Sequence, residues 1–145
     1  MKIKIQVQST GYPLTVSKKL VAILQRELDR LVVDQTTAEE QSEGVTFNFR
    51  DPDYSAESGG YHPVEISVDG EGRISYITDF AYVGIGAFAE LDREIDFDFG
   101  FRVFQHMGRE FPIERGASLF RIWQANFCSY VERQVFQISI TSHSS

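Results

Sequence analysis

Five carboxylates recur at every second position of one short segment, and they are the first candidates for chemistry in this sequence. They are Glu90, Asp92, Glu94, Asp96 and Asp98. Successive side chains of a β-strand point to opposite faces, and residues two apart lie about 7 Å from each other. The spacing therefore predicts a ladder of negative charge along one face of a strand. Apolar residues dominate the other face, with Arg93 as an exception.

Such a ladder permits three interpretations. It could be a docking face for a basic protein partner, a divalent-cation site, or the solvated face of a half-exposed antiparallel sheet. In the last case the charge would discourage edge-to-edge association. A cation such as calcium needs six to eight oxygens within about 2.6 Å, which one strand cannot supply. A neighbouring strand would therefore have to contribute ligands to any cation site on the ladder.

The loop from Asp51 to Pro63 is the second candidate. Tyr54, Glu57, Tyr61 and His62 combine aromatic, acidic and imidazole groups, a mixture that is typical of binding loops. His62 with Glu57 or Glu65 would form a general acid–base pair. The two glycines at 59 and 60 lack the pattern of a phosphate-binding loop. The simpler interpretation is a structural turn between two strands.

The remaining reactive residue types are scarce. The three histidines are His62, His106 and His143, and the one cysteine is Cys128. His106 and Glu110 have the spacing of a helical ligand pair, but Gly108 and Pro112 disfavour a helix there. Cys128 follows Phe127 in a predicted helix, where a buried and inert thiol is usual. We predict no catalytic residues, no metal and no cofactor, and hence a protein that is not an enzyme.

Length and net charge indicate a single domain and argue against nucleic-acid and membrane binding. The 145 residues suit one domain over 1–145, and the 21 acids against 14 Lys and Arg give a net charge of −7. Binding to nucleic acid or to an anionic membrane needs basic patches, so neither is expected, whereas a basic partner fits. The start of the sequence does not resemble a secretory signal, and no apolar run reaches membrane-spanning length. We expect a cytoplasmic protein.

Hydrophobic periodicity predicts the elements. Alternation indicates strands over 3–7, 45–49, 64–68, 73–83, 88–99 and 136–140, with shorter ones after Gly100 and over 110–114. Pro112 favours an edge position for the 110–114 strand. Helical spacing indicates helices from Ser17 to Asp34 and from Ala117 to Gln134, and residues 34–44 are expected to form a loop. The fold class is therefore α+β, a twisted and mostly antiparallel sheet flanked by an N-terminal and a C-terminal helix.

Three aromatic residues share a face of the second predicted helix. Trp123, Phe127 and Tyr130 would pack against the sheet, although part of this stripe could serve as an oligomer surface. A homo-oligomer is thus left open. The two terminal strands are expected to pair with each other or to lie at an edge of the sheet.

Three stretches resemble an uncharacterised family of gammaproteobacterial proteins that is classed as a domain of unknown function. They are residues 47–52 (FNFRDP), 58–65 (SGGYHPVE) and 123–127 (WQANF) with Tyr130. The resemblance covers nearly the whole chain and implies a fold like that of the mitochondrial acidic matrix proteins, which include the globular-head complement receptor. Those proteins form acidic ring-shaped trimers. The predicted strands outside the two helices set this chain apart from that pattern.

Two hypotheses follow for the function. The first is a non-enzymatic binding or adaptor protein that presents the acidic strand face to an unknown protein partner. The second is a small-molecule-binding or enzymatic domain with its site in the loop of residues 51–63.

Overall fold

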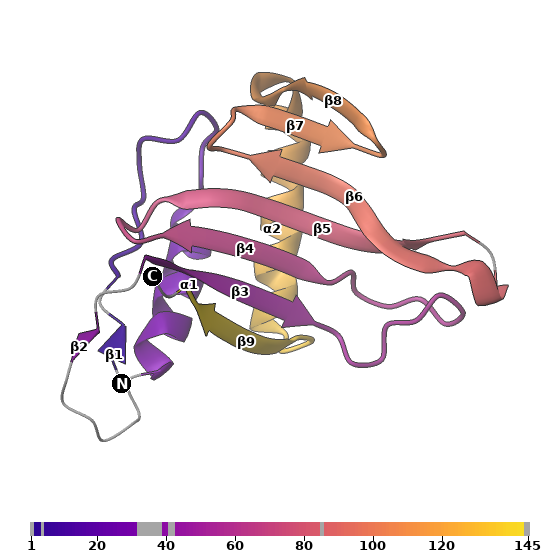
Figure 1. Ribbon diagram of the computed structural model, residues 1–145, viewed down its shortest axis with the longest axis horizontal. Helices are drawn as coiled ribbons and strands as arrows, with labels where there is room; N and C mark the ends of the chain where they lie inside the picture. Colours follow the sequence, from indigo (N-terminus) through magenta and orange to yellow (C-terminus); the bar gives the residue numbers. More distant parts are fainter. Residues whose placement is uncertain (1, 4, 32–38, 41–42, 85, 144–145) are drawn as a thin grey trace.

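One seven-stranded antiparallel sheet organises the molecule (Figure 1). The computed structural model describes residues 2–3, 5–31, 39–40, 43–84 and 86–143. The strands lie in the order β8-β7-β6-β5-β4-β3-β9. Their bounds are β3 Gly44–Arg50, β4 Val64–Asp69, β5 Ile74–Val83, β6 Glu90–Asp98, β7 Val103–His106, β8 Arg109–Pro112 and β9 Gln137–Ser142. The predicted α+β class with a twisted sheet is confirmed.

Two helices pack on one face of this sheet (Figure 1). Helix α1, Lys18–Arg30, has Ser17 as its N-cap, and the Ser17 hydroxyl accepts a hydrogen bond from the Leu20 amide. A 3₁₀-helix, η3 (Ile113–Gly116), leads into helix α2, Ala117–Glu132. The side chain of Gln124 in α2 accepts from the Ser17 amide and donates to the Thr15 carbonyl. It thereby fixes the start of α1 against α2.

The core lies between the helices and the sheet and is rich in aromatic rings. Phe49 contacts Phe127 edge-on at 4.8 Å between ring centroids, and Phe97 contacts Phe120 at 4.9 Å. Trp123 stacks on Phe127 at 5.0 Å. Aromatic pairs at such distances stabilise a core beyond the burial of their area. Trp123 and Phe127 are buried core residues as predicted, whereas Tyr130 is half-buried.

The N-terminal strand predicted over residues 3–7 is wrong for residues 5–7. Strand β1 is Lys2–Ile3 and pairs in parallel with β2, Glu39–Glu40, outside the large sheet. Ile5 and Val7 are nevertheless buried in the hydrophobic core. The segment is held there by the Gln25 side chain of α1, which accepts from the Val7 amide, and by the Gly72 carbonyl of the β4–β5 turn, which accepts from the Gln8 amide. The predicted end of the first helix at Asp34 lies outside the described residues, as does most of the predicted loop over 34–44. Where this segment is described, Glu39–Glu40 form strand β2 instead of a loop.

Both predicted edge strands are confirmed. Strand β9 pairs with β3 at one edge, and β8, which contains Pro112, forms the other. Because β1 pairs with β2, the two terminal strands do not pair with each other. Within the described residues, no helix is long and apolar enough to cross a membrane.

Strands β5 and β6 extend beyond α2 and beyond their neighbours in the sheet (Figure 1). We call this extension, residues 80–84 and 86–93, the arm. It contains the short 3₁₀-helix η2, Gly86–Phe88. Large apolar side chains are exposed on it: Tyr82, Val83, Phe88 and Leu91. The loop of residues 51–63 lies at the same end of the sheet (Figure 1).

Candidate functional site

A β-bulge in β6 divides the predicted acidic ladder. Asp79 lies opposite Ile95, but Phe80 lies opposite Arg93, so Glu94 is an extra residue in its strand. Residues directly opposite each other in antiparallel strands share a face, and a bulge shifts that alternation by one. The prediction of five carboxylates on one face is therefore wrong.

Asp96 and Asp98 point away from the helices and are engaged locally. Asp96 is only 8% exposed and accepts a hydrogen bond from the Thr78 hydroxyl at 2.6 Å. Its burial raises the pKa of its carboxyl group above the ordinary value. Asp98 accepts a hydrogen bond from the Phe101 amide. These two acids support the sheet and the following turn.

Glu90 and Asp92 lie on the helix side of the arm. Glu90 is opposite Val83 and Asp92 is opposite Ala81, and both acids are exposed. The Asp92 carboxylate also accepts a hydrogen bond from the amide of Arg93, whose side chain lies on the other face with Phe80. The bulge thus explains why Arg93 interrupted the apolar pattern in the sequence.

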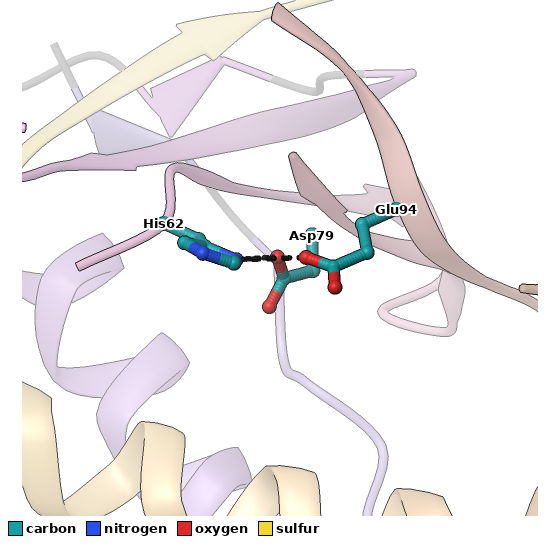
Figure 2. A group of neighbouring side chains, drawn as sticks. All are labelled: His62, Asp79 and Glu94. Carbon is teal, nitrogen blue, oxygen red and sulfur yellow. Dashed lines mark hydrogen bonds and ion pairs between the residues drawn. The ribbon is translucent and has the colours of Figure 1, made fainter. Parts of the chain in front are cut away.

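Glu94, at the bulge, joins the acidic strand to the loop of residues 51–63. Its Oε2 atom lies 3.0 Å from Nδ1 of His62, and the same nitrogen lies 2.9 Å from Oδ1 of Asp79 (Figure 2). One ligand atom from each of the three side chains lies within 4.8 Å of the other two. Two regions that the sequence presents separately therefore meet at one point.

Asp79 is the centre of this cluster, and it was missed in the sequence. Its side chain is 13% exposed, and its Oδ2 atom accepts a hydrogen bond from Nε1 of Trp123 at 2.8 Å. The available signal was a carboxylate that alternates with the apolar residues Ile77 and Ala81 in a predicted strand, and the structure places this face toward the helices. A charge at such a position is rarely buried without a partner.

The charges around His62 favour its protonated form. The pKa of the imidazole is raised by the hydrogen bond to Asp79 and by the negative charges of Asp79 and Glu94, which together outweigh the opposing effect of burial. An imidazole nitrogen carries at most one proton, and the one hydrogen bond of Nδ1 among the described residues is to Asp79. Oε2 of Glu94 is buried and accepts no hydrogen bond from the residues that the structure describes.

The loop of residues 51–63 is held by its own hydrogen bonds. Asp51 accepts from the amides of Asp53 and Tyr61. Gly60 has a φ of +134°, and a Cβ atom there would lie 3.0 Å from the Cα atom of Tyr54, so the turn requires glycine. The Tyr54 hydroxyl accepts from the Tyr82 amide, so the loop covers the edge of β5 where β4 has ended.

The four predicted loop residues separate into two groups. Tyr61 and His62 line a pocket of about 230 Å³, together with Asp79 and the aromatic residues Trp123, Tyr130 and Phe136. Tyr54 instead packs against the rings of His62 and Tyr82, and Glu57 is exposed and does not line the pocket.

The predicted acid–base pairs of His62 with Glu57 or Glu65 are wrong. His62 is paired with Asp79 and Glu94, while Glu65 accepts a hydrogen bond from the Tyr76 hydroxyl. His106 lies in strand β7, so it does not form a helical ligand pair with Glu110. Cys128 is buried, as predicted, and burial raises the pKa of its thiol.

Comparison with known proteins places the chain in a family. The model of a family described as "Protein of unknown function (DUF2787)" matches residues 18–141. The chain belongs to the DUF2787 family. No curated protein matches the sequence. The match covers both helices and every strand of the large sheet except the last residue of β9.

Two solved structures of Vibrio cholerae proteins share this fold. The hypothetical protein VC0508 from the VSP-II pathogenicity island is 38% identical, with a TM-score of 0.78 over 92% of this chain and 99% of that one. VC1805 from the pathogenicity island VPI-2 is 37% identical, with a TM-score of 0.76 over 91% and 98%. VC1805 is described as sharing structural homology with the human P32 protein. The resemblance drawn from the sequence is confirmed.

Proposed function

We propose that this DUF2787 protein is a non-enzymatic binding protein that docks a basic protein segment on the helix side of its arm. The observation that supports this proposal most strongly is the meeting of the acidic strand and an aromatic pocket at His62 and Asp79. Glu90 and Asp92 extend the negative surface from that point along the arm.

Exposed apolar side chains supply the second element of a docking surface. Phe88 near the tip of the arm is 86% exposed, and Val83 lies opposite Glu90 on the helix side. Exposed apolar groups beside polar ones are typical of protein interaction sites. A segment with basic and apolar residues would complement both features, and the net charge of −7 would favour its approach.

The pocket suits one side chain of such a segment. Its volume of about 230 Å³ is small beside the roughly 300–1,000 Å³ of pockets that hold drug-sized ligands. The surrounding rings would attract the head group of a lysine or arginine, because aromatic faces attract cations. The guanidinium of Arg133 already lies over Tyr61 and Tyr130 at the rim, 5.8 and 5.3 Å from the ring centroids.

Charge reversal on the arm tests the proposal. Proteins that cross-link to the wild type would be compared with those captured by Glu90→Lys/Asp92→Lys and by a control with the same charge change, Glu71→Lys/Glu114→Lys. Glu71 and Glu114 are exposed and lie outside the arm. We expect a partner that the control retains and the arm variant loses. Equal capture of every partner by both variants would contradict the proposal.

A further inference from the structure

We propose that His62, Asp79 and Glu94 form a binding site for one divalent transition-metal ion, with Zn²⁺ as the representative case. The three ligands come from the loop before β4, from β5 and from the bulge of β6. The loop and two strands thus converge on one point (Figure 2). Asp79 and Glu94 lie directly next to the arm, at what we call its base. The inference concerns this base and does not depend on a protein partner.

The distances suit a shared ion. Nδ1 of His62 lies 2.9 Å from Oδ1 of Asp79 and 3.0 Å from Oε2 of Glu94. When metal–ligand bonds are about 2.0–2.2 Å long, neighbouring ligand atoms of a tetrahedral or octahedral shell lie about 2.9–3.5 Å apart. The imidazole nitrogen is thus already at coordination separation from both carboxylate oxygens, which themselves lie within 4.8 Å of each other, so side-chain adjustments would complete the shell.

The charge balance of the cluster also favours an ion. Two carboxylates face one imidazole nitrogen, which can donate one proton to only one of them, and its hydrogen bond is to Asp79. Oε2 of Glu94 remains buried without a hydrogen bond among the described residues. A buried carboxylate oxygen without such a bond is unfavourable. A divalent cation in place of the proton would satisfy both carboxylates and would bind the imidazole nitrogen at the same time.

Surrounding groups hold two of the ligands in position. Trp123 donates to Oδ2 of Asp79, which leaves Oδ1 directed toward His62. Trp123 itself stacks on Phe127 in the core. The ring of Tyr54 packs against that of His62 at 5.4 Å between centroids. A hydrogen bond to a metal ligand, such as the one from Trp123 to Asp79, fixes the orientation of the ligand and raises metal affinity.

The ligand types select the class of metal. One imidazole nitrogen with two carboxylate oxygens suits Zn²⁺ and its transition-metal neighbours better than Mg²⁺ or Ca²⁺, which prefer oxygen ligands alone. The side chains of His62 and Glu94 are 38% and 32% exposed, so an ion can enter from solvent. Three protein ligands would leave room for water to complete the shell.

Calorimetric titration of the untagged, chelator-treated chain with zinc chloride tests the site. We expect one Zn²⁺ per chain in the wild type. His62→Gln and Glu94→Gln should each weaken binding at least about tenfold, because changes in second-shell groups alone cost about 10- to 100-fold. Glu90→Gln is the matched control, since it removes a neighbouring carboxylate on the same side of the sheet and should leave the affinity unchanged.

The outcomes that would overturn the site are equally definite. They are no binding by the wild type up to millimolar zinc, or wild-type affinity in Glu94→Gln. Should a variant fail to fold, nitrogen-15 spectra of the wild-type imidazoles decide the question. Zinc that shifts Nδ1 of His62 supports the site, and zinc that shifts only His106 or His143 refutes it.

Discussion

Strands β5 and β6 differ sharply between the half that the helices cover and the arm that projects beyond them. In the covered half Ile77 lies opposite Phe97, and both are almost fully buried. In the arm Tyr82 lies opposite Leu91, and both are exposed. The bulge at Glu94 separates the two halves. It shifts the alternation of β6 by one residue, so that even-numbered residues face away from the helices after the bulge and toward the helix side before it. One pair of strands thus supplies core packing at one end and an accessible surface at the other.

The largest effect should distinguish the two halves directly. Phe97→Ala removes a buried ring that contacts Phe104, Phe120 and Trp123, and should lower the free energy of unfolding by about 3–5 kcal/mol. Phe88→Ala in the arm should change it by less than about 0.5 kcal/mol, because an exposed ring loses little packing. Urea denaturation measures both. Similar losses in the two variants would contradict the division.

Removal of the Asp79 carboxylate should have the next largest effect. Asp79→Ala leaves the Trp123 indole N–H without its acceptor and leaves His62 with one neighbouring carboxylate, that of Glu94, instead of two. Unmade hydrogen bonds at buried groups cost about 1–3 kcal/mol, and we expect a loss in that range by the same denaturation experiment. Glu90→Ala, an exposed acid on the same side of the sheet, is the control and should change stability little. Equal effects would show that Asp79 does not hold the base of the arm.

The third effect depends on pH through His62, which faces Asp79 on β5 and Glu94 on β6. The raised pKa of His62 means that the folded state binds the proton more tightly than the unfolded state. The resulting stabilisation is fully present below the ordinary histidine pKa of about 6.5 and is lost as the pH rises through the folded-state value. The stability difference between wild type and His62→Gln should therefore shrink from pH 6 to pH 9. A difference that grows with pH would contradict this sign.

The smallest effect should come from Asp96, on the face away from the helices. The pKa of its carboxyl group is raised because burial disfavours the ionised form. The folded state therefore loses stability as the pH rises from the ordinary aspartate pKa to the higher pKa of Asp96 in the folded state. Asp96→Asn removes the charge and leaves an amide that can still bond Thr78. Thermal unfolding at neutral pH should show unchanged or slightly higher stability. A clear loss would mean that the ionised carboxylate stabilises the sheet.

Periodicity was sufficient to predict most of the fold. The alternation in β3, β4 and β9 and the helical spacing in α1 and α2 each follow from one buried face, which local sequence displays directly. The N-terminal segment misled because Ile5 and Val7 are buried by α1 and a turn rather than by strand pairing. That burial depends on tertiary contacts that alternation cannot report.

The candidate site was only partly predictable for a similar reason. Glu94 and His62 were both singled out, but 32 residues separate them and nothing local shows that they meet. Their contact requires the bulge, and bulges depend on how two strands are paired rather than on one strand alone. The two signals of this arrangement in the sequence were Arg93 among apolar residues and Asp79 alternating with Ile77 and Ala81. Each has its explanation only in the paired strands.

The titration of His62 followed by nuclear magnetic resonance tests the central claim most directly, namely that the bulge brings Glu94 to His62 beside Asp79. We predict a His62 pKa above the ordinary value of about 6.5 in the metal-free chain. It should fall most in Asp79→Asn, which removes the hydrogen-bonding carboxylate, and less in Glu94→Gln. An ordinary pKa that neither substitution changes would contradict the account.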